Sequence, residues 1–252
     1  MFNYSKFFFN KVGIVTGGGS GIGLDTSIKL ANFGAKVYAT YRKENKEIKK
    51  IKNFNFKKNG KIIFIKLKSI EEKNIKELLI KIRKKDKLVQ FLVNNIGNAI
   101  NRSKFIKSNE NLWKSNFEIN LFSNLRFTKH FLNLFTHKKT SSIVNVGSIA
   151  GKTGGYGDST HYAASKAAVH ALTKGLAREI KGVRVNCVAP SVIDTPFQKR
   201  LSSKTRLRNI IKKTPLQRIG KVDEVSNTIV FLVSNYSSYV NGEVIFVSGG
   251  RN

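Results

Sequence analysis

The sequence has only one cysteine, one tryptophan, three prolines and few acidic residues. Features that the sequence lacks exclude several classes of protein. With Cys187 alone, no disulfide framework can form within the chain, and a reducing compartment is permitted. The longest uninterrupted apolar runs, residues 62–65 and 229–233, are far shorter than the ~20 residues of a membrane-spanning helix. Residues 1–10 carry no small-residue cleavage site and do not resemble a signal peptide. We therefore expect a soluble, cytoplasmic protein with no membrane partner.

Positive charge is abundant: 46 Lys and Arg stand against 15 Asp and Glu, a formal net charge of +31. A field of this size would attract polyanions. However, lysine supplies 35 of the 46 basic residues, and asparagine, isoleucine and phenylalanine, the other residues with AT-rich codons, are also common. The basic residues of segment 42–87 are spread over several expected elements and form no compact nucleic-acid motif. We interpret the charge as compositional drift and expect no specific nucleic-acid partner.

Short apolar segments alternate with amphipathic ones along the whole chain. The predicted strands are residues 11–16, 36–40, 61–67, 89–94, 142–147, 183–188 and 243–248. The predicted helices are residues 22–33, 44–57, 71–85, 109–137, 161–180 and 222–234. Nearly all-apolar strands alternating with helices are typical of a parallel sheet covered on both faces. With right-handed crossovers, the pattern predicts an α/β protein with one doubly wound, Rossmann-like domain of about seven strands over residues 1–252.

The first predicted strand leads directly into the glycine-rich segment 16–23, and a helix follows. Gly17 permits the tight turn, Gly21 lets the backbone approach a pyrophosphate, and Gly23 lets the helix pack against the sheet. The helix N-terminus presents N–H groups and a positive dipole end to phosphates. The segment therefore predicts a dinucleotide site. Its expected contacts are Thr16, Gly17, Ser20, Gly21, Ile22 and Gly23.

The spacing Thr-Gly-x-x-x-Gly-x-Gly resembles that of the short-chain dehydrogenase/reductase family, and further motifs follow in the family's order. They are Asn94-Asn95-Ile96-Gly97, Asn120, Ser148, Tyr162 with Lys166, and the segment 190–195. The resemblance covers about residues 11–250. It implies an NAD(P)-dependent oxidoreductase that moves a hydride between nicotinamide and a carbonyl or secondary alcohol.

The resemblance implies that Asn120, Ser148, Tyr162 and Lys166 are catalytic. Hydride transfer requires a proton to reach or leave the substrate oxygen, and Tyr162 is the natural donor, although a free phenol has a pKa of ~10. Lys166 follows one helical turn later, so its ammonium should lower the pKa of Tyr162, and the family's lysine also holds the nicotinamide ribose. In the family, the residue at Ser148 positions the substrate oxygen and that at Asn120 holds a water.

The cofactor choice depends on the end of the second strand, where the family tends to carry an Asp when it uses NAD. This sequence has no acid there, and Arg42 can pair with a 2′-phosphate. After the third strand, residues 66–69 also lack the family's usual Asp. We predict NADP as the preferred cofactor, with NAD as the alternative. By resemblance, Asn94, Tyr162, Lys166, Ile193 and Thr195 complete the cofactor contacts.

Two further features depart from the family or vary within it. Ser191 stands where the family usually has glycine; we expect a negative φ at Ser191 and an otherwise unchanged loop. In the family the substrate pocket is the most variable region, and here it should come from residues 149–159 and 195–214; we expect the second segment to form a mobile lid over the cofactor. The four histidines show no metal-ligand spacing, so we expect no metal site.

Three functions remain open from sequence. The first is a generic carbonyl reductase or alcohol or sugar dehydrogenase acting on a small molecule. The second is a 3-oxoacyl-carrier-protein reductase acting on an acyl-carrier-protein thioester. The run 175–179 and the basic surface favour this function. Against it, Asn133 stands where that enzyme has a docking Arg, and the link 180–183 is short. The third is a polyanion-binding protein on a reductase scaffold. The resemblance also implies a homo-oligomer, a tetramer or dimer.

Overall fold

The computed structural model describes residues 3–135 and 141–251, and its centre is a seven-stranded, fully parallel sheet. The strand order is β3-β2-β1-β4-β5-β6-β7, so the direction of winding reverses between β1 and β4. The strands are β1 (Val12–Val15), β2 (Lys36–Tyr41), β3 (Lys61–Lys66), β4 (Phe91–Asn94), β5 (Ser141–Val146), β6 (Val183–Pro190) and β7 (Val244–Val247). The predicted doubly wound α/β fold is confirmed, with each strand within a few residues of its expected place.

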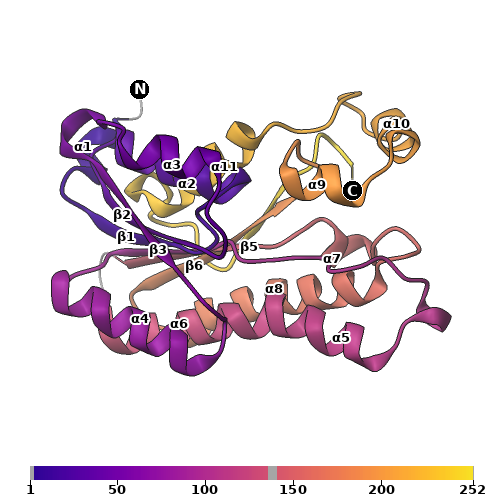
Figure 1. Cartoon of the computed structure of the whole chain (residues 1–252), viewed down its shortest axis with the longest axis horizontal. Helices are drawn as coiled ribbons and strands as arrows, with labels where there is room; N and C mark the ends of the chain where they lie inside the picture. Colours follow the sequence, from indigo (N-terminus) through magenta and orange to yellow (C-terminus); the bar gives the residue numbers. More distant parts are fainter. Residues whose placement is uncertain (1–2, 136–140, 252) are drawn as a thin grey trace.

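Helices cover both faces of the sheet (Figure 1). One layer holds α2 (Gly21–Asn32), α3 (Lys46–Lys52) and α11 (Val222–Val233). The other holds α4 (Glu72–Lys85), α5 (Glu110–Phe117), α6 (Ser123–Phe135) and α8 (Thr160–Glu179). Each layer has its own buried apolar cluster, one built around Val37, Val93 and Ile229 and the other around Ile14, Leu92 and Phe131. Nearly all-apolar strands are therefore required, because both faces of the sheet are buried.

The chain begins with a short helix that the sequence pattern did not predict, α1 (Tyr4–Phe8). The Phe8 side chain is fully buried, with ring centroids 6.2 Å from Phe33 and 6.0 Å from Phe91. The aromatic run near the N-terminus thus seals one end of the core. Offset and edge-to-face ring contacts of this kind stabilise beyond simple burial.

Two predicted helices differ from their expected bounds. The helix expected over residues 44–57 ends at Lys52, and the 3-10 turn η1 (Lys57–Asn59) follows, with positive φ at Lys58. The long helix is interrupted between α5 and α6 by one π-helical turn, η3 (Glu118–Phe122). Its expected end at residue 137 lies outside the described residues.

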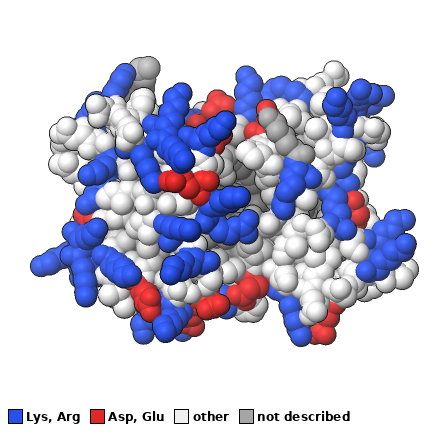
Figure 2. All heavy atoms as spheres, in the orientation of Figure 1, with Lys and Arg blue, Asp and Glu red and all other residues white. Residues whose placement is uncertain are grey.

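Short helical segments flank the carboxyl ends of the strands. They are η2 (Phe105–Lys107), α7 (Ala150–Thr153), α9 (Pro196–Leu201) and α10 (Lys204–Lys212), whereas η4 (Asn235–Ser237) lies at the amino ends, where Ser237 Oγ accepts from Arg184 near the start of β6. Of these, α9 and α10 lie together beyond the end of β6, where the lid was expected (Figure 1). No helix in the described part of the chain is both long and apolar enough to cross a membrane. Lysine and arginine are scattered over the face in Figure 2 and interspersed with acidic residues.

Candidate active site

A cleft of about 650 Å³ opens at the carboxyl ends of the strands. It runs from the ends of β2 and β3, across the glycine-rich turn after β1, to the ends of β5 and β6. In open parallel sheets this point of reversed winding is where ligands bind. The predicted site residues in its lining are Gly17, Ser20, Gly21, Ile22, Arg42, Ser148, Tyr162, Lys166, Ile193 and Thr195. Thr16, Gly23, Asn94 and Asn120 lie outside the lining.

The glycine-rich turn is held by packing that excludes side chains. Gly17 has a φ of +62°, a conformation that glycine adopts without strain. A Cβ on Gly18 would lie 2.8 Å from the Cβ of Ala39 on β2, and a Cβ on Gly23 would collide with the carbonyl oxygen of Gly17. The Ser20 side chain makes no capping hydrogen bond to α2. The turn is therefore a rigid cradle at a helix N-terminus, which suits a phosphate group.

Thr16 and Asn95 tie the glycine-rich turn to the end of β4. The Thr16 hydroxyl oxygen accepts hydrogen bonds from the backbone N–H groups of Asn95 and Ile96, at 2.9 and 3.1 Å. The Asn95 side-chain amide donates to the carbonyls of Thr16 and Gly17, both at 3.1 Å. Asn95 lines the cleft and was not singled out from sequence.

Asn94 is fully buried beneath the cleft. Its side-chain amide donates to Thr128 Oγ1 on α6 and to Asn145 Oδ1 on β5, both at 2.9 Å. Asn145 in turn donates to Thr173 on α8 at 2.9 Å. Asn94 thus belongs to a buried polar network that joins β4, β5, α6 and α8, and it does not line the cleft.

Basic side chains gather at the end of the cleft formed by β2 and β3. Arg42, Lys43 and Lys68 all line it, together with Ser69. Asn45 fixes the nearby turn, because its amide donates to the carbonyl of Gly19 at 2.8 Å. This end of the cleft therefore favours an anionic group.

Asn120 lies in the π-helical turn η3 and is fully buried. Its Oδ1 accepts from the backbone N–H of Asn98 at 2.9 Å, and its Nδ2 donates to the Asn98 carbonyl at 2.8 Å and to Ser165 Oγ at 3.1 Å. The side chain therefore clamps the loop after β4 to the long helix and to α8. Single π-turns inside helices are frequent at functional sites.

Ser148, Tyr162 and Lys166 meet at the other end of the cleft. Tyr162 shares a hydrogen bond with Ser148. Lys166 Nζ lies 6.0 Å from the centroid of the Tyr162 ring and donates to the Val146 carbonyl at 2.8 Å. Tyr162 and Lys166, one turn apart on α8, therefore line the same cleft as Ser148.

The pKa shifts differ from the simple expectation that Lys166 lowers the pKa of Tyr162. Burial raises the pKa of Tyr162, while the Ser148 hydrogen bond and the positive charge of Arg102 lower it. Burial also lowers the pKa of Lys166 to about 8. The pKa of Tyr162 is raised overall, because desolvation of the buried phenolate outweighs the groups that lower the pKa.

Ser191 lies in the turn that follows β6. Ser191 has no positive φ, and its backbone N–H donates to the Val247 carbonyl at 3.0 Å. Its hydroxyl accepts from Arg251 at 3.3 Å. Thr195 then caps α9 by accepting from the N–H of Gln198 at 3.2 Å. The expected negative φ at Ser191 is confirmed.

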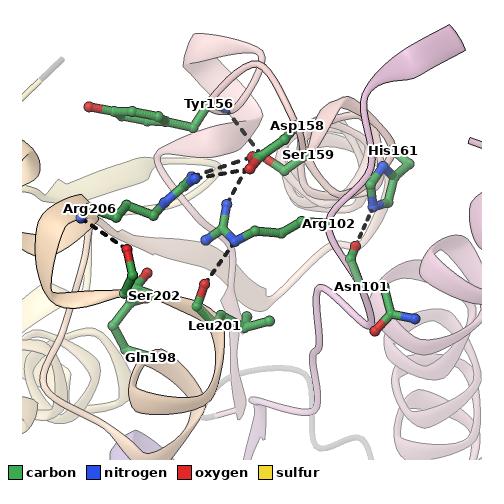
Figure 3. A network of polar contacts seen from close by, with 11 residues as sticks. Asn101, Arg102, Tyr156, Asp158, Ser159, His161, Gln198, Leu201, Ser202 and Arg206 are labelled. Carbon is green, nitrogen blue, oxygen red and sulfur yellow. Dashed lines mark hydrogen bonds and ion pairs between the residues drawn. The ribbon is translucent and has the colours of Figure 1, made fainter. Parts of the chain in front are cut away.

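An ion-pair network that the sequence did not reveal joins the loop after β4 to α8, α9 and α10 (Figure 3). Arg102 Nη1 and Arg206 Nη1 each lie 3.0 Å from a carboxylate oxygen of Asp158. Arg102 Nε also donates to the Leu201 carbonyl at the end of α9, at 2.9 Å. The guanidinium of Arg206 lies 4.7 Å from the Tyr156 ring centroid. The network fastens the predicted lid to the loops beside Tyr162.

Cys187 and His161 are both buried, in surroundings that indicate structural roles. Cys187 is fully buried on β6, and burial raises its pKa to about 12, so the thiol is unreactive. His161 is buried and its Nε2 lies 2.9 Å from the Asn101 carbonyl. Across residues 3–135 and 141–251, no group of three or more His, Cys, Asp and Glu side chains is placed to hold a metal ion.

Comparisons with known proteins agree on one family. A family model described as Enoyl-(Acyl carrier protein) reductase matches residues 17–252. The chain is 37% identical over 245 residues to the 3-oxoacyl-(acyl-carrier-protein) reductase of Thermotoga maritima, covering 95% of this chain and 97% of that one. It is 35% identical to the same enzyme of Escherichia coli, covering 96% and 98%. A solved short-chain dehydrogenase/reductase of Brucella melitensis, titled glucose/ribitol dehydrogenase, has a TM-score of 0.87 at 29% identity and 98% coverage of both chains.

Proposed function

This chain belongs to the short-chain dehydrogenase/reductase family of nicotinamide-dependent oxidoreductases, and we propose that it reduces the keto group of a 3-oxoacyl thioester with NADPH. The observation that carries the chemistry is the junction of Ser148, Tyr162 and Lys166 at one end of the cleft. The substrate class comes from the two reductases similar over nearly the whole chain, whose names specify 3-oxoacyl groups on acyl carrier protein.

The residues of the cleft fit a dinucleotide. Gly17 and Gly21 both have a positive φ, a conformation that disfavours a side chain, and α2 begins at Gly21. The nicotinamide, when bound, supplies the hydride. Ile193 and Thr195 line the cleft beside Ser148, so they would hold the ring near the substrate carbonyl.

Proton transfer falls to Tyr162. Its hydroxyl donates the proton to the substrate oxygen, and Ser148 positions that oxygen within hydrogen-bond reach. Lys166, when protonated, favours the phenolate left behind. Asn120 acts through position, because its hydrogen bonds to Asn98 and Ser165 fix the cleft-lining loop after β4 against α8.

The preference for NADPH is supported by charge. Arg42, Lys43 and Lys68 line the end of the cleft where a 2′-phosphate would lie, and no acidic residue stands at the end of β2. Arginine pairs with phosphate through two parallel hydrogen bonds. NAD would lack the 2′-phosphate that these cations recognise.

A second candidate is reduction or oxidation of a small carbonyl, alcohol or sugar without a carrier protein. Two observations favour it: Asn133 on α6 stands where a docking arginine was expected for a carrier-protein reductase, and only residues 180–182 separate α8 from β6. For polyanion binding, the scattered charge of Figure 2 supports only weak, salt-sensitive association.

We also propose self-association through the long helix. Phe122, the last residue of η3, and Leu125 on α6 lie about one helical turn apart and are 42% and 39% exposed. A second copy would cover them, as the family's dimers and tetramers imply. Light scattering on the purified chain would give the mass; a monomer at micromolar concentration would contradict this.

A substrate panel tests the proposed function. The purified enzyme should be assayed with acetoacetyl-carrier-protein, acetoacetyl-coenzyme A, simple ketones and ketoses, each with NADPH and NADH. We expect kcat/KM to be highest for the carrier-protein thioester with NADPH. A higher kcat/KM for free ketones or sugars would favour the second candidate, and no turnover of any compound would contradict both.

A further inference from the structure

His170 lies on the same side of α8 as the proposed catalytic residues Tyr162 and Lys166. The three residues are spaced four apart, so their side chains follow one another along one face of the helix. Within residues 3–135 and 141–251, the buried Nε2 atom of His170 has no hydrogen-bond partner. A buried nitrogen without a partner costs stability, so hydrogen bonding does not explain the imidazole at this position.

The imidazole packs against the turn that carries Ser148. This turn begins at Gly147, directly after β5, and reaches Gly151 in α7. A Cβ on Gly147 would lie 2.6 Å from His170 Nε2, and a Cβ on Gly151 would lie 2.8 Å from His170 Cε1. Both distances are too short for real contacts, so the ring occupies the space that side chains at the two glycines would need. Ser148 therefore stands between two points of backbone that rest on one ring.

Neighbouring strands hold the ring and the turn in place. Phe246 on β7 meets the imidazole edge to face, with the ring centroids 5.9 Å apart. The backbone of the turn is fixed to β6, because the N–H groups of Gly147 and Ile149 donate to the carbonyls of Val188 and Pro190, at 2.8 and 2.9 Å. The turn is thus hydrogen-bonded to β6 and packed on the imidazole of α8.

The imidazole is uncharged near neutral pH. Burial, together with the positive charges of Lys166 and Lys174, lowers the pKa of His170 to about 4. A neutral ring can pack on backbone without a counter-ion, whereas a buried charge needs a partner. The side chain therefore acts here through its shape.

We propose that His170 is a positioning residue for Ser148, because its ring supports both ends of the turn and so fixes where the Ser148 hydroxyl meets the substrate oxygen. This rests on the proposed role of Ser148 in placing that oxygen. A displacement of about 1 Å at such a group can reduce the rate by about 100-fold. The glycine-rich cradle lies at the other end of the cleft, so the effect should fall on turnover and spare the binding of NADPH.

A double-mutant cycle with Ser148 tests the proposal, with kcat measured for NADPH and the panel compound that has the highest kcat/KM. His170→Ala leaves a void against the turn, so kcat should fall about tenfold, while the Kd for NADPH changes by less than about twofold. In a Ser148→Ala background, His170→Ala should lower kcat by less than about twofold, because the hydroxyl that it positions is already absent.

Val169→Ala is the matched control. It removes methyl groups from a fully buried position adjacent to His170, whose side chain points about 100° away around α8. Its kcat should stay within about twofold of that of the unmodified enzyme. His170→Phe provides a second test if His170→Ala does not fold: its larger ring should displace the turn and lower kcat at least about threefold.

Three results would overturn the proposal. They are an unchanged kcat in His170→Ala or His170→Phe, an equal fall of kcat in Val169→Ala, and an equally large effect of His170→Ala with and without the Ser148 hydroxyl. Unchanged kcat in Ser148→Ala alone, or no turnover by the unmodified enzyme of any compound in the panel, would instead overturn the proposed function, and this inference with it.

Discussion

The two ends of the cleft are built by different means. At the phosphate end, the turn after β1 is fixed by close packing: Gly18 touches Ala39, and Gly23 packs on the carbonyl of Gly17 with no space for a methyl group. At the substrate end, α9 and α10 are fastened by ion pairs from Arg102 and Arg206 to Asp158.

The difference matters because close packing and ion pairs resist movement to different degrees. Close-packed backbone resists displacement because any shift creates overlap or a void. Partly exposed ion pairs contribute modestly and can exchange partners with water, so they suit segments that move to admit substrate. We propose that the dinucleotide cradle is preformed and that the substrate side opens and closes.

The largest expected effect lies at the junction of the two ends. Tyr162→Phe removes the proton donor and leaves the ring, so turnover should fall by about 10²–10⁴-fold. NADPH affinity should change little, because the cradle around Gly17 and Gly21 is untouched. Steady-state assays and NADPH fluorescence titration measure the two separately. Turnover near that of the unmodified enzyme would remove Tyr162 from the mechanism.

Packing at the phosphate end is tested by a pair of glycine substitutions. Gly23→Ala should cost about 1–3 kcal/mol in the free energy of unfolding and weaken NADPH binding, because its methyl group meets backbone. In Gly175→Ala the methyl group meets no atom within 4 Å, and the change should stabilise α8 by ~0.5–1 kcal/mol. Urea unfolding compares them; equal stabilities would contradict the packing account.

Cofactor selection should show a smaller effect. Arg42→Ala removes one of three cations at the end of the cleft, so the preference for NADPH over NADH should fall roughly tenfold, or ~1.4 kcal/mol. Lys50→Ala, which removes an exposed cation from α3, is the control. The ratio of kcat/KM for the two cofactors is the measurement. An unchanged ratio in Arg42→Ala would show that other residues determine the preference for NADPH over NADH.

The smallest effect is expected at Ser191. Because its φ is not positive, glycine gains little there, and Ser191→Gly should leave the KM for NADPH within about threefold, ~0.7 kcal/mol. Loss of the contact from Arg251 is the main change. A tenfold lower KM would show that the serine strains the turn.

The phosphate end could be predicted from sequence because its signals are local. The glycines, the strand before them and the helix after them lie within about twenty residues, and their spacing fixes the turn. The motif could not show which of Asn94 and Asn95 reaches the cleft. Asn94, the last residue of β4, is buried, whereas Asn95, the first residue after the strand, lines the cleft.

The substrate end could not be predicted, for two physical reasons. Asp158 pairs with arginines 56 and 48 residues away, and among 46 basic residues no local pattern marks Arg102. The π-turn that carries Asn120 does not disturb the apolar periodicity of the long helix, so the sequence pattern predicts an ordinary α-helix there. The structure of the substrate end is determined by contacts between segments that are distant in the sequence.

The most direct test of the contrast is hydrogen–deuterium exchange, resolved by peptide, at low and high sodium chloride. Raising salt from about 0.1 to 1 M shortens the screening length from about 10 to 3 Å and should weaken the Asp158 ion pairs. We predict at least threefold faster exchange in residues 98–104 and 196–212, no change in residues 13–32, and no salt response of the first two segments in Asp158→Asn. Equal salt responses at both ends of the cleft, or a response in Asp158→Asn as large as in the unmodified chain, would contradict the account.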